Sequence, residues 1–109
     1  MHLIEIKNAE LMETLQARVT ELGITNGAVV SLIGAVDSFR ISTMPEDDAT
    51  KDIVTDYELP AEMSGTGEIV DGMPHIHAVM AVQGDRGIAG HLHAASVGTW
   101  FARVYIQPF

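Results

Sequence analysis

The sequence predicts an α+β fold in which a curled, mostly antiparallel β-sheet packs on one main helix. One segment near the start has apolar residues at helical spacing, and the rest is a series of short apolar or alternating runs separated by glycine. Forty-seven per cent of the 109 residues are apolar, which is enough to form one packed core. We therefore expect a single domain that covers residues 1–109.

The first segments predict a short strand followed by the one long helix. Residues 2–7 alternate apolar and polar side chains, as a half-buried strand does. Asn8 can cap a helix that begins after it, and Gly23 is a residue at which such a helix can end. Between them, apolar residues recur at helical spacing: Leu11, Leu15, Val19 and Leu22. We expect this amphipathic helix to lie on the sheet.

The remaining segments predict strands joined by short turns. Residues 28–33 are almost entirely apolar, which favours a buried strand, and Gly34 after them favours a bulge or a close backbone approach. Residues 36–42 alternate like a half-exposed strand, and the polar residues 43–52 predict an exposed loop. Further strands are expected at residues 53–59, 62–70, 75–82, 88–94 and 99–106. Asp71-Gly72 and the stretch QGDRG predict the turns around the third of these strands.

The composition excludes several classes of protein. Because the chain has no cysteine, it has no disulfide, thiolate metal ligand or cysteine nucleophile, which fits a cytoplasmic location. No apolar run reaches the roughly 18 residues of a membrane span, and the first residues lack the pattern of a signal peptide. Fifteen acidic residues outnumber six scattered basic ones, for a net charge of −9. Direct DNA binding is not expected, because phosphate contacts need clustered lysine and arginine.

Four of the five histidines fall in two similar tetrapeptides, PHIH and GHLH. They are His75 and His77 in the first and His91 and His93 in the second. Residues two apart in a strand point to the same face, so the two histidines of each tetrapeptide project together. Whether the two pairs meet depends on the turn that joins their strands.

Two odd-length turns would bring the histidine pairs onto one face. A three-residue turn centred on Gly84 would place His77 opposite His91 and His75 opposite His93. A centre at Asp85 would instead place His77 opposite His93. In both registers all four imidazoles share a face, with opposed Cβ atoms about 4.5–5.5 Å apart. A turn with an even number of residues would break this arrangement.

A cluster of this kind has the chemistry of a divalent-metal site. Imidazole nitrogens bind Zn²⁺ at about 2.0–2.1 Å, and three of them leave a position for water, whereas four close the site. A ligating histidine also needs its second ring nitrogen oriented by an acceptor, and Glu68 on the preceding strand is the nearest candidate in the sequence. One HxH pair would be weak evidence, but the second pair favours a metal.

Two stretches, SGTGEIVDGMPHIHAVM and GIAGHLHAASVGT, resemble the plant-and-prokaryote-conserved (PPC) domain. The shared pattern is a glycine-bearing strand, an acidic-Gly turn, Pro-His-x-His-Ala and then Gly-His-Leu. The earlier stretch ELGITNGAVVSLIGAVDSFRIS is similar to the helix end and the following strands of the family, so the resemblance covers nearly the whole chain. It implies a PPC-like fold that assembles as a homotrimer. It also places His75, His77 and His91 on the family's recurring histidines, and leaves His93 outside them.

More distantly, the fold and the ligand pattern are similar to acetolactate decarboxylase, whose zinc is held by an HxH pair and a further histidine. Two departures from the PPC pattern stand out. Ala89 replaces the first glycine of Gly-Gly-His-Leu, and the last strand lacks the glutamate that is common near its start. The Arg-Gly-Arg hook that precedes the domain in plants has no counterpart in these 109 residues.

The leading hypothesis is a homotrimeric binding or regulatory module with a zinc site formed by His75, His77 and His91. Trp100, Phe101 and Tyr105 are the candidate contacts between subunits, although ordinary core packing would explain them equally well. A small-molecule ligand at the metal fits this hypothesis.

The alternative is a small metal-dependent enzyme of a lyase or decarboxylase type that acts on a small carboxylate. Glu68 would be its acid or base, and Arg103 or Arg40 would hold the carboxylate of the substrate. His93 would lie in the pocket or support a ligand. A regulator that associates with DNA is a third and weaker hypothesis, since the charge opposes it.

Overall fold

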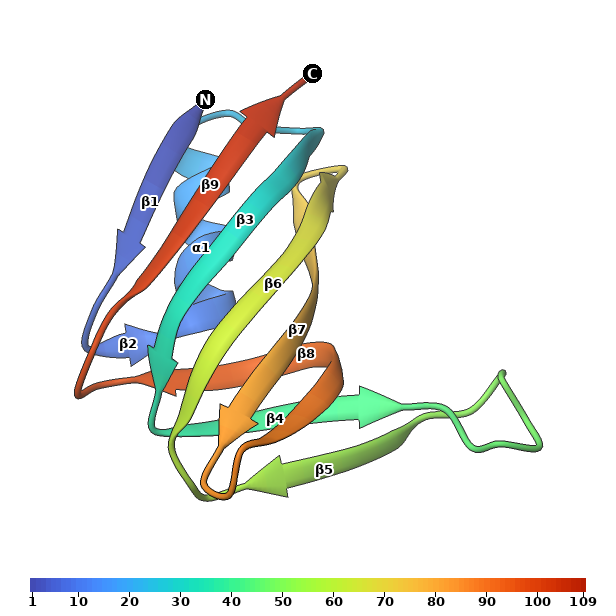
Figure 1. Ribbon diagram of the computed structural model, residues 1–109. Coiled ribbons are helices and arrows are strands. Elements are labelled where there is room, and N and C mark those ends of the chain that lie inside the picture. The colour runs from blue at the N-terminus through green and yellow to red at the C-terminus, as the bar shows by residue number, and fades with distance from the viewer.

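One continuous sheet forms most of the molecule, and the predicted α+β fold class is confirmed (Figure 1). The computed structural model describes all of residues 1–109. The elements in chain order are β1 (His2–Ile6), β2 (Ala9–Glu10), α1 (Leu11–Glu21), β3 (Gly27–Val36), β4 (Ser38–Thr43), β5 (Ile53–Tyr57), β6 (Ala61–Val70), β7 (Met73–Val82), β8 (Arg86–Val97) and β9 (Ala102–Pro108). The helix α1 lacks the length and the apolar character that a membrane-crossing helix needs.

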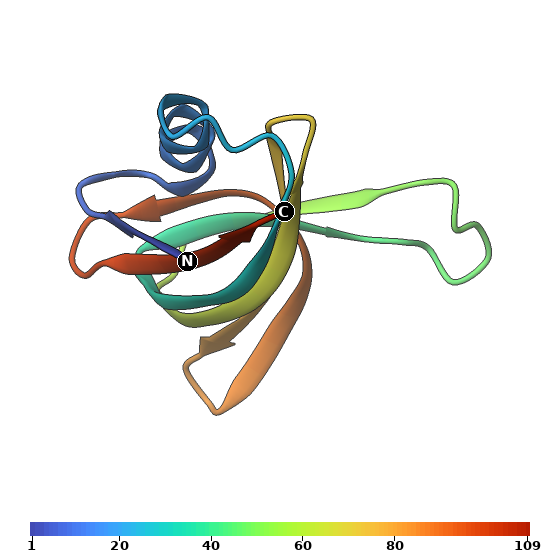
Figure 2. The ribbon, with the colours of Figure 1, turned by 90° about the horizontal axis from the view of Figure 1, so that it is seen from above.

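The sheet has the strand order β1-β9-β3-β6-β7-β8-β4-β5, and the short β2 pairs with β8. Every pair of neighbouring strands is antiparallel. Seen from above, the sheet curls strongly, and α1 covers one side of the curl (Figure 2). The helix packs on β8, β1 and β7, and one cluster of 24 buried apolar residues fills the space between helix and sheet.

The helix has the predicted buried stripe but a different cap. Leu11, Leu15 and Val19 are buried, whereas Leu22 lies beyond the last helical residue and is 40% exposed. Asn8 was the expected cap, but it lies in a turn with φ of 51°, and Glu10 caps the helix instead. The carboxylate of Glu10 accepts hydrogen bonds from the first backbone amides of the helix and also from the amide of Ala95 on β8. The cap therefore also ties the helix to the sheet.

Two glycines allow neighbouring strands to approach closely. At Gly34, a Cβ atom would clash with the carbonyl oxygen of Phe101 before β9, so Gly34 marks a close approach while the β3 bulge lies earlier, between Val29 and Leu32. At Gly67 on β6, a Cβ atom would clash with the carbonyl oxygen of His75 on β7. The backbone next to the histidines of β7 therefore requires a residue without a side chain on β6.

Strand β8 has different neighbours along its length. Arg86 to His91 pair with β7, and His91 to Ser96 pair with β4 on the other edge of the strand. The strand therefore leaves β7 after His91 and crosses toward the helix (Figure 1). Strands β4 and β5 form a long arm that projects from the body and carries the polar loop at its tip (Figure 2).

Candidate metal centre

The strand register brings His77 and His91 directly opposite each other on β7 and β8. Val82 pairs with Arg86, so the intervening turn is centred on Gly84, the first of the two registers that the sequence allowed. Gly84 and Asp85 both have positive φ, as a tight turn between strands requires. His91 also pairs with Ser42 of β4, so its backbone is held from both sides.

Three imidazoles converge on this pair. One ring nitrogen from each of His75, His77 and His91 lies within 4.8 Å of the other two. The ring centroids are 4.9 Å apart for His75 and His77, 5.1 Å for His75 and His91, and 5.7 Å for His77 and His91. The ligand atoms of a tetrahedral zinc ion lie about 3.4 Å from one another. Side-chain rotations that move the ring nitrogens by roughly an ångström would therefore complete the geometry. The donor set therefore fits a divalent metal.

Glu68 supports the cluster from the neighbouring strand β6. It pairs with His75 in the β6–β7 ladder, and its Oε2 lies 3.0 Å from Nδ1 of His75. This contact occupies Nδ1 and leaves Nε2 as the nitrogen that can bind a metal. A carboxylate in this position fixes the orientation of the imidazole ring.

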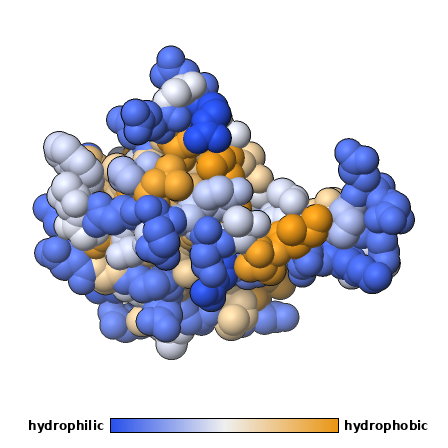
Figure 3. All heavy atoms as spheres, turned by 90° about the horizontal axis from the view of Figure 1, so that it is seen from below, coloured by the Kyte–Doolittle hydropathy of each residue, from blue (hydrophilic) through white to orange (hydrophobic).

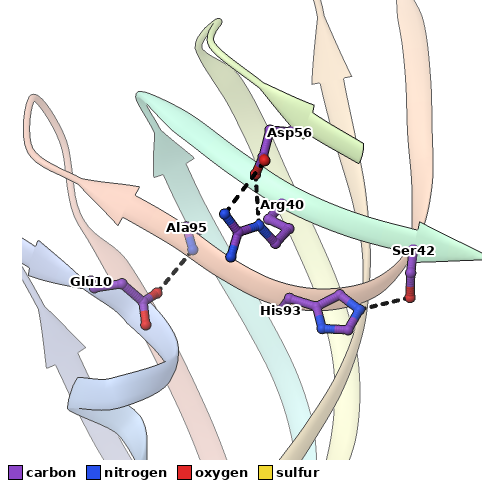
Figure 4. Close-up of polar contacts among 6 residues, drawn as sticks. All are labelled: Glu10, Arg40, Ser42, Asp56, His93 and Ala95. Carbon is purple, nitrogen blue, oxygen red and sulfur yellow. Dashed lines mark hydrogen bonds and ion pairs between the residues drawn. The ribbon is translucent and has the colours of Figure 1, made fainter. Parts of the chain in front are cut away.

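His93 differs from the other three because it is the extra residue of a β-bulge. Arg40 of β4 pairs with Ala94 and Ile41 pairs with Leu92, so His93 has no partner in the ladder. It also lies past the end of the β7–β8 pairing, so the expected pairing of His75 with His93 does not form. Its Nε2 instead lies 2.8 Å from Oγ of Ser42 (Figure 4). Bulges commonly redirect a side chain beside a functional site.

The surroundings of His91 disfavour its charged form. Burial lowers the pKa of His91, and the nearby imidazoles of His93, His75 and His77 lower it further by repulsion of the charged form, while Asp52 opposes the shift. A histidine must be neutral to bind a metal. The lowered pKa of His91 therefore favours the neutral form, which is the form that binds a metal.

A pocket of about 930 Å³ opens beside the cluster. It is lined by His77 and His91, by His93, by residues of β6 such as Ser64 and Thr66, and by Asp52 at the start of β5. A smaller hollow of about 310 Å³, lined by Glu68 and His75 among others, adjoins the cluster at His77, which lines both spaces. A metal held by the three histidines would therefore be reachable from an open pocket.

Comparison with known families identifies the domain. The whole chain, residues 1–109, matches the Plants and Prokaryotes Conserved (PCC) domain, the domain also abbreviated PPC. The chain belongs to this family. The recognition of a PPC domain from the two histidine-bearing stretches and the earlier stretch ELGITNGAVVSLIGAVDSFRIS is confirmed. A search of curated proteins found no significant match.

Several solved structures share the fold of this PPC domain. A PPC protein from Pyrococcus horikoshii is 19% identical, with a TM-score of 0.79 over 99% of this chain and 79% of that one. A metal-containing protein from Archaeoglobus fulgidus is 22% identical, with a TM-score of 0.80 over 98% and 79%. A candidate DNA-binding protein from Bacteroides thetaiotaomicron is 19% identical, with a TM-score of 0.83 over 98% and 77%. At these identities the likeness establishes the fold.

The two arginines proposed as carboxylate binders lie away from the pocket of this PPC domain. Arg103 pairs with Glu5 at 3.0 Å and lies 4.1 Å from the centre of the Phe101 ring. Arg40 pairs with Asp56 at 2.7 Å across β4 and β5 (Figure 4). Neither arginine lines the pocket, so the structure does not bring them together with the three histidines.

Two residues of the site have no counterpart in the sequence-based prediction. Ser42 anchors His93, and Asp52 is the one acidic side chain of the pocket. Both come from the β4–β5 arm, in which β4 pairs with β8, a segment about 50 residues further along the chain. Strand periodicity carries no signal for a partner that distant, whereas the β7–β8 hairpin is visible from its turn.

Proposed function

We propose that this PPC-domain chain binds one divalent metal ion, zinc, through His75, His77 and His91, and acts as a homotrimeric binding or regulatory module. The convergence of three ligand nitrogens within 4.8 Å carries the proposal. The Glu68 contact at Nδ1 of His75 supports it, because that contact orients a ligating imidazole.

The donor chemistry favours zinc. Three neutral imidazoles, with no carboxylate among the three ligands and no cysteine in the chain, suit Zn²⁺ better than hard ions such as Mg²⁺ or Ca²⁺, which bind oxygen. Three protein ligands leave a coordination position for water or a ligand oxygen. The related Archaeoglobus fulgidus structure is of a metal-containing protein, which agrees with a site of this kind.

Exposed apolar side chains support self-association. Ile33 of β3 and Val79 of β7 both lie opposite Ser64 of β6 in the sheet and are about half exposed. From below, apolar atoms gather between the body and the projecting arm (Figure 3). Of the three expected subunit contacts, Trp100 is 63% exposed, whereas Phe101 and Tyr105 are partly buried. A trimer would cover such surfaces.

The pocket beside the histidines favours a second candidate, a small metal-dependent enzyme. A metal with an open position can polarise a carbonyl group or activate a bound water. The pocket of about 930 Å³ is large enough for a small substrate. The DNA-binding description of the Bacteroides relative does not favour a third candidate here, because the net charge is −9 and five of the six basic residues are in ion pairs.

Metal analysis tests the proposal directly. Protein purified without a histidine tag and offered zinc is expected to hold about one equivalent per chain, measured by elemental analysis after desalting. His91→Ala is expected to abolish uptake, and His93→Ala is the matched control that leaves it intact. Less than a tenth of an equivalent in the unaltered protein would end the metal assignment, and a greater loss for His93→Ala than for His91→Ala would overturn the ligand set.

Light scattering on a sizing column tests the trimer. The expected mass is about three times the 11.7 kDa of one chain. Ile33→Ser is expected to lower the mass, because it places a polar group in the exposed apolar surface, whereas Val70→Ser, also on an exposed strand position, is the control. A monomer for the unaltered chain at micromolar concentration would contradict the trimer.

A further inference from the structure

We infer that the pocket beside the histidine cluster binds a small ligand that has one oxygen-donating, metal-binding group and an uncharged, hydrogen-bonding body. The inference rests on the proposed function, because the metal anchors one end of the ligand. It adds a class of ligand: compounds with one metal-binding group and with alcohol, amide or carbonyl groups elsewhere. Dicarboxylates and phosphate esters are excluded from that class.

The charges around the pocket carry the argument. No lysine or arginine lines it, and Asp52 is its one charged side chain apart from the histidines. Five basic residues are held in ion pairs with acidic partners, and the sixth, Arg86, begins β8 beside the hairpin turn and outside the lining. A second negative charge on the ligand would therefore lie near Asp52 without a cation to compensate it. The single charge of a metal-bound group is compensated by the metal.

The polar groups of the lining suit an uncharged body. Ser64 and Thr66 of β6 and Thr43 of β4 bring side-chain hydroxyls to the lining, and Met44 and Val79 add apolar surface. A hydroxyl can donate one hydrogen bond and accept others, so it matches alcohols, amides and carbonyls. Fixed hydroxyls among apolar side chains are the usual means by which a small-molecule site orients an uncharged ligand.

His93 is the positioned hydrogen-bonding group of this pocket. Its Nε2 is held by Ser42, which leaves Nδ1 as the nitrogen that a ligand can contact. Ser42 is only 4% exposed, so its hydroxyl positions the imidazole and is not accessible as a nucleophile. The ring of His93 lies 4.7 Å from that of His91, so a ligand bound at the metal would also be within reach of His93. The bulge thus places His93 where it can contact a bound ligand.

Two hydroxamic acids of the same shape test the ligand class. The probes are the monohydroxamates of succinamide and of succinic acid, which differ only in a terminal amide or carboxylate. Cobalt-loaded protein reports their binding through its visible absorption bands. The amide probe is expected to bind at least tenfold more tightly than the carboxylate probe. Equal binding, or tighter binding of the carboxylate probe, would overturn the inference.

Variants assign the effect to particular side chains. Asp52→Asn is expected to reduce the preference for the amide probe several-fold, and Asp47→Asn, the same charge change in the polar loop but outside the lining, is expected to leave it unchanged. His93→Ala is expected to weaken the amide probe about tenfold while cobalt uptake stays at one equivalent. If Asp52→Asn and Asp47→Asn behave alike, or if His93→Ala binds the probe normally, the pocket does not recognise the ligand as inferred.

A metal-free measurement keeps this test separate from the metal assignment. Failure to take up cobalt would refute the metal assignment and with it the contact of the ligand with the metal, but not the charge selectivity of the pocket. The pocket can then be probed without metal by ligand-observed NMR with succinamide and succinate at millimolar concentration. Saturation transfer to succinamide but not to succinate would support the charge argument, and the transfer to succinamide should be lost in the His93→Ala variant. Equal transfer to both would refute it.

Discussion

Replacing Glu68 with alanine should weaken metal binding without unfolding the protein. The carboxylate lies 3.0 Å from Nδ1 of His75 and is the group that orients this imidazole. Removal of such an outer partner lowers metal affinity by about 10–100-fold. Here both side chains are about half exposed, at 45% for His75 and 53% for Glu68, and solvent screens the contact. We therefore expect the low end, about a tenfold loss, which corresponds to about 1.4 kcal/mol.

Competition with a chromophoric zinc chelator measures this loss. Glu62→Ala is the matched control, because Glu62 is also an exposed acid on β6 and lies opposite Ala81, away from the histidines. Glu68→Gln should lose less than Glu68→Ala, because its amide oxygen can still accept a hydrogen bond from His75. If Glu68→Ala and Glu62→Ala lower the zinc affinity equally, general charge is responsible and the orienting role is refuted.

Two further predictions concern the metal-free protein. Because folding lowers the pKa of His91, this side chain binds a proton more tightly in the unfolded chain than in the folded one. The free energy of unfolding should therefore fall as the pH drops through about 6.5, the ordinary pKa of histidine, and should be steady above that pH. Urea titrations across this range should show a weaker pH dependence for His91→Gln; an unchanged dependence would contradict the assignment. Gly67→Ala should destabilise the protein by about 1–3 kcal/mol, since its Cβ meets the carbonyl of His75. Gly87→Ala, which meets only a Val79 methyl group at 3.4 Å, should destabilise it less in thermal melts.

Local patterns predicted most of the fold. The helix from Leu11, the buried strand around Val29 and the hairpin of β7 and β8 follow from periodicity and turn chemistry, which act between residues close in sequence. The sequence left two registers of that hairpin open, and one of them is the observed pairing of His77 with His91. The PPC resemblance then separated three histidines from the fourth. Features that depend on distant pairing were not predictable in the same way.

Two of the failed predictions share one cause. Glu10 caps the helix because β8 offers the amide of Ala95 as a further partner, and His93 leaves the expected pairing because β8 crosses to β4. Both depend on where β8 goes after His91. A strand that changes neighbours along its length has no signature in its own alternation of apolar and polar residues.

The hairpin of β7 and β8 contains all three proposed metal ligands within residues 75–91. By contrast, β3 pairs with β9 across most of the chain, as in the contact of Gly27 with Pro108. Closing a short loop costs less chain entropy than closing a long one, and local contacts form sooner during folding. The ligand set therefore needs only the hairpin to assemble, so a metal can be captured by a chain whose outer strands are still unpaired. An ion bound at that stage would stabilise this hairpin before the outer strands pair.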